Sequence, residues 1–266
     1  MKHLLSILYT LAVLLLASTE GRCADLQKGW DAFNNGDYAA AFREWKPLAE
    51  QGDAKARFLV GAMYYDGQGV PHDHKEAVKW YRLAAEQAYA LAQNNLGLMY
   101  YEGQGVIQDY ALARKWLQLS AGQGVPEAQF LLGWMYYKGQ GVLHNYTEAA
   151  QWLRLAADQE LAVAQTNLGL MYLKGQGVPR NYNEAFKWFK LAAVQGEGIA
   201  QVNLGLMYFK GHGVPQDHTE AANWYWFAAD QGAPSAQIKL GMMYEYGRGV
   251  FQDYVSAYMW YSLGAL

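Results

Sequence analysis

A repeat of 36 residues, the interval from Gly61 to Gly97, constrains the fold of this chain more than any other feature. The interval recurs without insertion, and each copy has Gly, Met, Tyr, a G-x-G-V motif and Trp at the same positions. Self-similarity at one period of roughly 20–50 residues is typical of repeat proteins, whose units stack on their neighbours. The glycine column contains Gly61, Gly97, Gly133, Gly169, Gly205 and Gly241, and the tryptophan column contains Trp80, Trp116, Trp152, Trp188, Trp224 and Trp260.

Each repeat is predicted to form two helices. In the second copy, Ala92, Leu96, Met99 and Tyr100 have the spacing of one helical face, and Gly103 stands where a left-handed residue ends a helix. The other helix begins at an Asp or Asn, and a Glu three residues later predicts a capping box. The chain is therefore predicted to be all-α, a right-handed α/α superhelical solenoid of about seven helix pairs. The capping pairs are Asp73 with Glu76, Asn145 with Glu148, Asn181 with Glu184, and Asp217 with Glu220.

The repeated columns also predict how the helices pack. A glycine inside a helix costs up to about 1 kcal/mol against alanine, so its recurrence indicates that a neighbouring helix approaches where a side chain would clash. We expect that neighbour to be the helix that carries the tryptophan column, and we expect the six tryptophans to lie in the core. Trp226 belongs to a column that is otherwise polar, which predicts an indole exposed on the outer surface.

The pattern A-Q-x-N-L-G-x-M-Y-x-x-G-x-G-V, followed by D-Y-x-x-A-x-x-W-x-x-x-A-A-x-Q-G, resembles the Sel-1-like repeat family, a relative of the tetratricopeptide repeats. The resemblance covers residues 53–266 and implies an α/α superhelix that binds other proteins; several bacterial members are exported and act in envelope or host interactions. Residues 25–52, with Leu26, Gly29 and Phe33, resemble an ordinary tetratricopeptide unit without the G-x-G-V insertion. In some members of the family, cysteine pairs crosslink each repeat. Residues 25–266 contain no cysteine, so the activities of those cysteine-rich members are not expected for this chain.

Residues 1–24 are predicted to be a secretory signal peptide. Lys2 supplies a positive start, and the apolar run from Leu4 to Ala17 is shorter than the roughly 18 residues that span a bilayer. Small residues offer a cleavage position, which we place after Cys23 or Ala24. We therefore expect an exported protein, periplasmic or extracellular, with no membrane insertion after cleavage.

Charge and motifs argue against most other functions. A formal net charge of -3 provides no basic surface for nucleic acid. The G-Q-G-V turn lacks the third glycine of a dinucleotide fingerprint and the lysine of a P-loop. His72 and His74 flank Asp73 at a turn and are interpreted as solvated neighbours of a helix cap, not as metal ligands. Without a nucleophile motif or H-E-x-x-H, the sequence predicts a non-enzymatic protein with no cofactor and no metal.

In a solenoid, partners bind to the residues on the concave side that vary between repeats. We expect the helix that carries N-L-G to line this groove, and we expect the groove to bind an extended or helical segment of another protein. Its aromatic residues would act as anchors, and its lysines would favour acidic side chains or a carboxylate terminus. Alternatively, the lysines form a solvated face and the aromatics cover their own repeat. The predicted groove residues are Asn94, Leu98, Tyr101, Phe130, Trp134, Tyr137, Lys138, Lys174, Phe209 and Lys210.

The sequence thus favours an exported scaffold whose partners are other proteins. Two alternatives stay open: an envelope-associated enzyme or enzyme subunit acting on cell-wall or exopolysaccharide material, and a secreted factor that engages host proteins. The helix from Tyr254 to Leu266 is almost uncharged, whereas solenoids need polar caps, which makes this helix a candidate for self-association.

Overall fold

The computed structural model describes residues 26–265, and every regular element within them is a helix. The predicted signal peptide lies outside these residues. Residues 26–34 are helical, and the helices that follow have 11 to 13 residues each. Among the described helices, none combines the length and the hydropathy that a membrane span requires. The bounds are α2 Tyr38–Glu50, α3 Ala54–Asp66, α4 His74–Ala85, α5 Ala90–Glu102, α6 Tyr110–Gly122, α7 Pro126–Lys138, α8 Tyr146–Asp158, α9 Ala162–Lys174, α10 Tyr182–Val194, α11 Gly198–Lys210, α12 His218–Asp230, α13 Pro234–Tyr246 and α14 Tyr254–Gly264.

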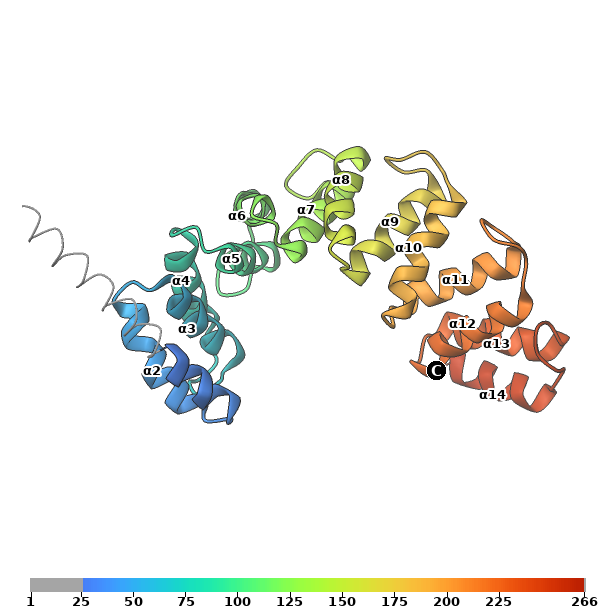
Figure 1. The fold of residues 1–266 in the computed structure, drawn as a ribbon, viewed down its shortest axis with the longest axis horizontal. Coiled ribbons are helices and arrows are strands. Elements are labelled where there is room, and N and C mark those ends of the chain that lie inside the picture. The colour runs from blue at the N-terminus through green and yellow to red at the C-terminus, as the bar shows by residue number, and fades with distance from the viewer. Residues whose placement is uncertain (1–25, 266) are drawn as a thin grey trace, which may run out of the picture. The chain divides into compact units, whose positions relative to one another are not determined.

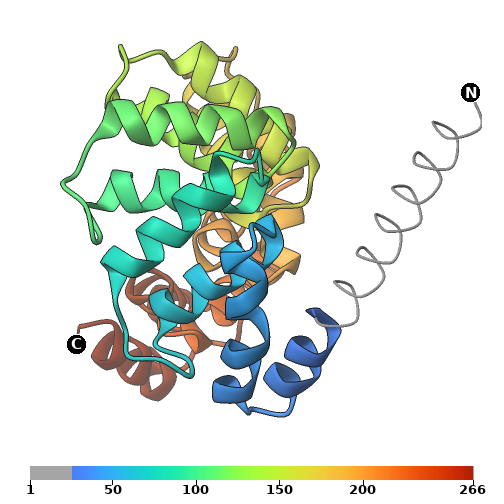
Figure 2. The same cartoon turned by 90° about the vertical axis from the view of Figure 1, so that its left-hand side faces the viewer.

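The chain divides into two compact units, Met1–Val125 and Pro126–Leu266, and each is described by itself. Within each unit every helix packs against the next one along the chain, so that pairs such as α9 with α10 and α11 with α12 follow one another (Figures 1 and 2). Alanine side chains from both helices of a pair form most of the core, together with leucines and with methionines of α9, α11 and α13. The predicted all-α solenoid of helix pairs is confirmed.

The glycine column lies at close helix crossings, as predicted, but the tryptophans are not the residues that meet it. A β-carbon on Gly169 would lie only 2.8 Å from Cε1 of Phe189, which is fully buried. Phe189 follows Trp188 by one residue, a step that turns a side chain about 100° around the helix. The helix that packs on Gly169 is the one that carries the tryptophan column, as predicted, but the contact is made by the residue after the tryptophan. Trp80 and Trp188 are buried beside the crossings, whereas Trp116, Trp152, Trp224 and Trp260 are half-buried at the edge of the core.

The predicted N-caps are present, but the glutamates do not complete capping boxes. The Oδ1 atom of Asn181 accepts bonds from the backbone N–H groups of Asn183 and Glu184, at 3.0 and 3.1 Å. The N–H of Asn181 itself donates to the carbonyl of Tyr172 in the preceding helix, 3.0 Å away. The Glu184 carboxylate therefore has no N–H to accept there, and it acts on the positive end of the helix instead. The same carbonyl bond occupies the N–H groups of Asp73, Asn145 and Asp217.

The G-x-G turn brings each repeat against the previous one. Gly175 ends α9 in the left-handed conformation, with φ of 70°. Gly177, with φ of 69°, lies on the first residue of α8, where a β-carbon would overlap the carbonyl oxygen of Tyr146. Gln176, between the two glycines, donates to the hydroxyl of Tyr146 and accepts from the hydroxyl of Tyr137, both at 3.1 Å. The second glycine is thus required for close approach between repeats as well as for the turn.

A buried glutamine in the A-Q-x-N motif joins successive helix pairs. The Nε2 atom of Gln165 donates to the carbonyl of Ala157 in α8 at 3.1 Å, and its Oε1 atom accepts from Nε2 of Gln195 at 2.9 Å. Gln201 makes the equivalent bonds one repeat later, at 3.2 and 3.0 Å. Because buried amides need partners, these bonds specify how one pair sits on the next.

Replacing Gln165 by leucine is expected to lower the free energy of unfolding by about 1–3 kcal/mol, because two hydrogen bonds between helices are lost, one to the carbonyl of Ala157 and one from Nε2 of Gln195. Urea denaturation followed by circular dichroism measures this loss. The matched control is Gln151→Leu, which changes an exposed glutamine of α8. Equal losses in the two variants would show that the buried bonds contribute nothing specific.

Candidate protein-binding surface and pocket

The ten predicted groove residues lie on four helices, three of them on α5 in the first unit and seven on α7, α9 and α11 in the second. The three lysines are exposed and the other seven residues are half-buried, so all ten reach the surface of their unit. The column that contains Phe130 is interrupted, however. Thr166, one repeat later, is buried, and its hydroxyl donates to the carbonyl of Ala162 at 3.0 Å.

Three aromatic rings stack along α7, and we call Phe130, Trp134 and Tyr137 the aromatic ladder. The centroids of Phe130 and Trp134 are 6.5 Å apart, and those of Trp134 and Tyr137 are 5.6 Å apart with planes 12° from parallel. The ammonium of Lys138 lies 4.7 Å from the centroid of the Trp134 ring, within the range of a cation–π contact. The ammonium of Lys138 therefore lies on the half-exposed aromatic ladder.

The Tyr137 hydroxyl also has a structural role, because it donates to Gln176 across the repeat boundary. In the first unit, Tyr65 makes the equivalent bond to Gln104 at 2.9 Å. This column of tyrosines therefore joins repeats through its hydroxyls while its rings remain half-exposed.

Lys138, Lys174 and Lys210 are the last residues of α7, α9 and α11. A positive side chain there interacts favourably with the carbonyl end of a helix, which accounts for part of this pattern. Within residues 26–265, no carboxylate lies within ion-pair distance of these three ammonium groups. Their charges are therefore available to an acidic partner.

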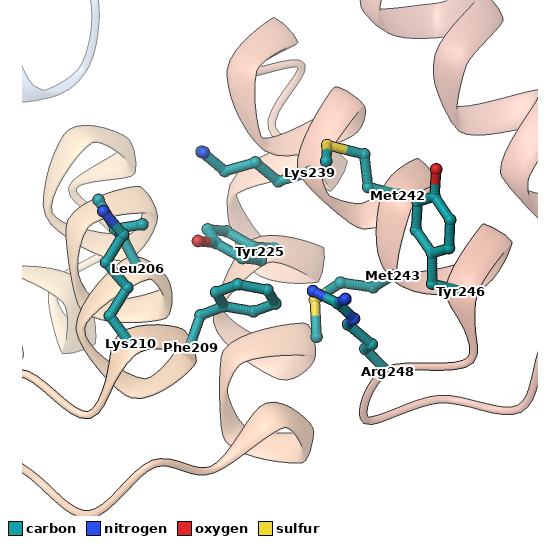
Figure 3. Close-up of a pocket in the computed structure, with 9 residues that line it drawn as sticks. All are labelled: Leu206, Phe209, Lys210, Tyr225, Lys239, Met242, Met243, Tyr246 and Arg248. Carbon is teal, nitrogen blue, oxygen red and sulfur yellow. The ribbon is translucent and has the colours of Figure 1, made fainter.

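An open pocket of about 450 Å³ lies between α11 and α13, over Tyr225 of α12. Figure 3 shows Leu206 and Lys210 on one side, Met242 and Tyr246 on the other, and Tyr225 with Phe209 between them. Phe209 and Lys210 were predicted as groove residues. The remaining lining residues are Lys239, Met243 and Arg248.

The pocket combines aromatic walls with three cations. Lys239 lies 5.8 Å from the centroid of Tyr225, and the Arg248 guanidinium lies 5.9 Å from that of Phe209. Burial raises the pKa of the Tyr225 phenol well above its ordinary value, so this hydroxyl stays neutral near pH 7. The nearby Glu245 is bonded to Tyr261, whose hydroxyl donates to it at 2.6 Å. The lining residues thus carry positive charge without a carboxylate.

Lys239 and Arg248 are not among the predicted groove residues, although the repeat pattern of the sequence holds a signal for both. Lys239 stands where three earlier repeats have Asn and two have Leu, and Arg248 stands where four earlier repeats have Gln and one has His. Residues that depart from the repeat consensus are not needed for packing between repeats, so they are candidates for binding.

Trp226 is 45% exposed, which confirms the predicted exposure of this indole, and its ring lies 5.5 Å from that of Phe227. On α14, Val255 and Tyr258 are 81% and 76% exposed, so this helix presents apolar surface. Self-association through that surface stays a prediction.

Consecutive helix pairs with a variable surface define an α/α repeat protein, a class whose common role is protein interaction. The family model described as Sel1 repeat matches residues 54–89, 90–125, 126–161, 162–197, 198–232 and 234–266, and the chain belongs to this family. Sel1 repeat proteins are typically non-enzymatic scaffolds. No curated protein matches the chain.

Forty-three chains of solved structures match the fold. One is a protective antigen of uropathogenic Escherichia coli with an SLR fold, at 35% identity and a TM-score of 0.87 over 95% of this chain and 55% of that chain. This protein therefore spans about half the length of that relative. Another is a Sel1 repeat protein from Oxalobacter formigenes, at 32% identity and a TM-score of 0.81 over 90% of this chain and 96% of that chain.

Proposed function

We propose that this protein is an exported, non-enzymatic scaffold that binds a segment of another protein on the surface of α7, α9 and α11. The observation that carries the proposal is the half-exposed aromatic ladder with Lys138 on Trp134, because tryptophan and tyrosine are enriched among the residues that dominate binding energy at interfaces. The Sel1 family supports the scaffold role. Export rests on the charged start and short apolar run of residues 1–24, and the protective antigen among the similar structures is in keeping with it.

We expect Trp134→Leu to lower the affinity for the captured partner about tenfold or more, because the leucine cannot stack with both neighbours. Leucine occupies this column at Leu98, Leu170 and Leu206, so the fold should tolerate it. Immobilised protein is exposed to envelope extract and to culture supernatant, and the bound proteins are identified and titrated. The control is Trp226→Leu, which removes an exposed indole elsewhere.

A second arm of this experiment reverses the charges of Lys138, Lys174 and Lys210 to glutamate. Binding should weaken and its salt dependence should flatten, since rim charges act through screened attraction. The matched control reverses Lys115, Lys187 and Lys190, which are exposed on α6 and α10. Unchanged partner affinity in both the Trp134 and the lysine variants would contradict the proposed surface, and hydrolysis of a wall polymer by the purified protein would contradict the non-enzymatic role.

A further inference from the structure

The pocket between α11 and α13 departs from the array in a coordinated way. In two earlier repeats a tyrosine hydroxyl donates to the glutamine of the following G-x-G turn, from Tyr65 to Gln104 and from Tyr137 to Gln176. The repeat before the pocket has Leu173 and His212 at these positions and cannot form this bond. At the pocket, Phe209 and Arg248 occupy those two positions, and the hydrogen bond is replaced by a cation–π contact at 5.9 Å. The exchange removes a bond between repeats and places a guanidinium with several N–H donors at the pocket.

The three cations come from three different places. Lys210 is the last residue of α11, Lys239 lies within α13, and Arg248 lies in the turn that follows α13. Figure 3 shows all three lining the same pocket, with Lys239 above Tyr225 and Arg248 beside Phe209 in this view. Among residues 26–265, none of these three groups has a carboxylate partner within ion-pair distance. A group of unpaired cations over one cavity favours a ligand that carries the opposite charge.

The pocket walls favour a ligand with an apolar body. Met242 is 48% exposed and Tyr246 is 59% exposed, although both occupy the pocket wall. Methionine side chains adapt to varied apolar shapes, and a ligand would remove this surface from water. A volume of about 450 Å³ is in the range of small-molecule sites.

We propose that this pocket binds a small organic anion that has a carboxylate or sulfonate head and an apolar aromatic or acyl body. The head would accept hydrogen bonds from Arg248 and one or both lysines, while the body lies against Leu206, Phe209 and Met242. The pocket shares Phe209 and Lys210 with the predicted groove on α11, whereas Trp134 of α7 does not line it. Trp134→Leu therefore tests the protein-binding surface separately from the pocket.

Titration of the purified protein with anilinonaphthalene sulfonate (ANS), whose fluorescence rises in apolar sites, tests the proposal. Lys239→Asn and Arg248→Gln restore the residues that other repeats carry, so both variants should fold. Each is expected to weaken ANS binding about tenfold, because each removes a charged partner of the anionic head. The control Lys190→Gln removes an exposed lysine of α10 and should leave the affinity unchanged.

Competition and location separate this site from nonspecific binding of the dye. Dodecanoate should displace ANS, and dodecanol, which lacks the charge, should not. In methyl-labelled methionine NMR spectra, the signals of Met242 and Met243 should shift on addition of dodecanoate, whereas that of Met99 in the first unit should not.

A final experiment asks whether the carboxylate head belongs to a small molecule or to the C-terminus of a peptide. A short Gly/Ser peptide that ends in leucine and phenylalanine is tested with a free and with an amidated terminus. Stronger displacement of ANS by the free terminus than by dodecanoate would overturn the small-molecule assignment in favour of a peptide terminus. Unchanged ANS affinity in both cation variants, or equal competition by dodecanol, would overturn the anionic-ligand proposal itself.

Discussion

Replacing Gly177 by alanine is expected to lower the free energy of unfolding by about 2–5 kcal/mol. An L-residue at φ of 69° costs about 1–2 kcal/mol. The new β-carbon would also overlap the carbonyl of Tyr146 and lie 2.8 Å from the backbone nitrogen of Thr147. These are backbone atoms at the start of a helix, so they cannot rotate away, and overpacking of this kind costs about 1–3 kcal/mol more. Urea denaturation measures the total.

The control for this prediction is Gly196→Ala. Gly196 also has a positive φ, of 92°, but a β-carbon there would have no atom within 4 Å. It should therefore show only the left-handed penalty, about 1–2 kcal/mol. Because repeats interact mainly with their neighbours, hydrogen exchange in Gly177→Ala should increase first around α8 and the turn after α9. If the two variants lost the same stability, the close approach between repeats would not matter energetically.

Replacing Phe189 by alanine is expected to cost about 3–5 kcal/mol, the usual range for truncating a fully buried phenylalanine. The ring fills the space that Gly169 leaves at the crossing of α9 and α10, and removing it opens a cavity in the core. Phe189→Leu should cost less than about 1.5 kcal/mol, because leucine fills the equivalent position at Leu153.

Phe227→Ala is the matched control, since it truncates the same side chain on α12, where it is 48% exposed. Its loss should stay below about 1 kcal/mol. Comparable losses at Phe189 and Phe227 would mean that the ring opposite the glycine is not a principal contact of the core.

Most of the fold was predictable because its determinants act over short distances along the chain. The spacing of Ala92, Leu96 and Met99 identifies a helix, and Gly103 ends it in the left-handed conformation that the motif predicts. The Asp and Asn caps follow the same local logic. The capping boxes were predicted wrongly because the N–H of each cap is bonded to a tyrosine carbonyl of the preceding helix, a partner that the local motif does not contain.

The candidate surface was predictable only in part. Variation along the N-L-G helix identified Trp134, Lys138 and Phe209 as surface residues, since a repeat leaves such positions unused by its own packing. Lys239 and Arg248 could not be assigned to the pocket from their spacing. One projects from within α13 and the other from the turn after it, and only packing against α11 brings them together over Tyr225.

The sequence by itself determined the repeat, the family, the helices and most of their ends, because these depend on backbone bonds and side-chain types within a few residues of one another. The tertiary structure decided which residues meet between helices. One step along a helix turns a side chain by about 100°, so the contact at Gly169 falls to Phe189 and not to Trp188. It also decided that three cations from separate segments line one pocket, because that grouping depends on the distances and rotations between packed helices.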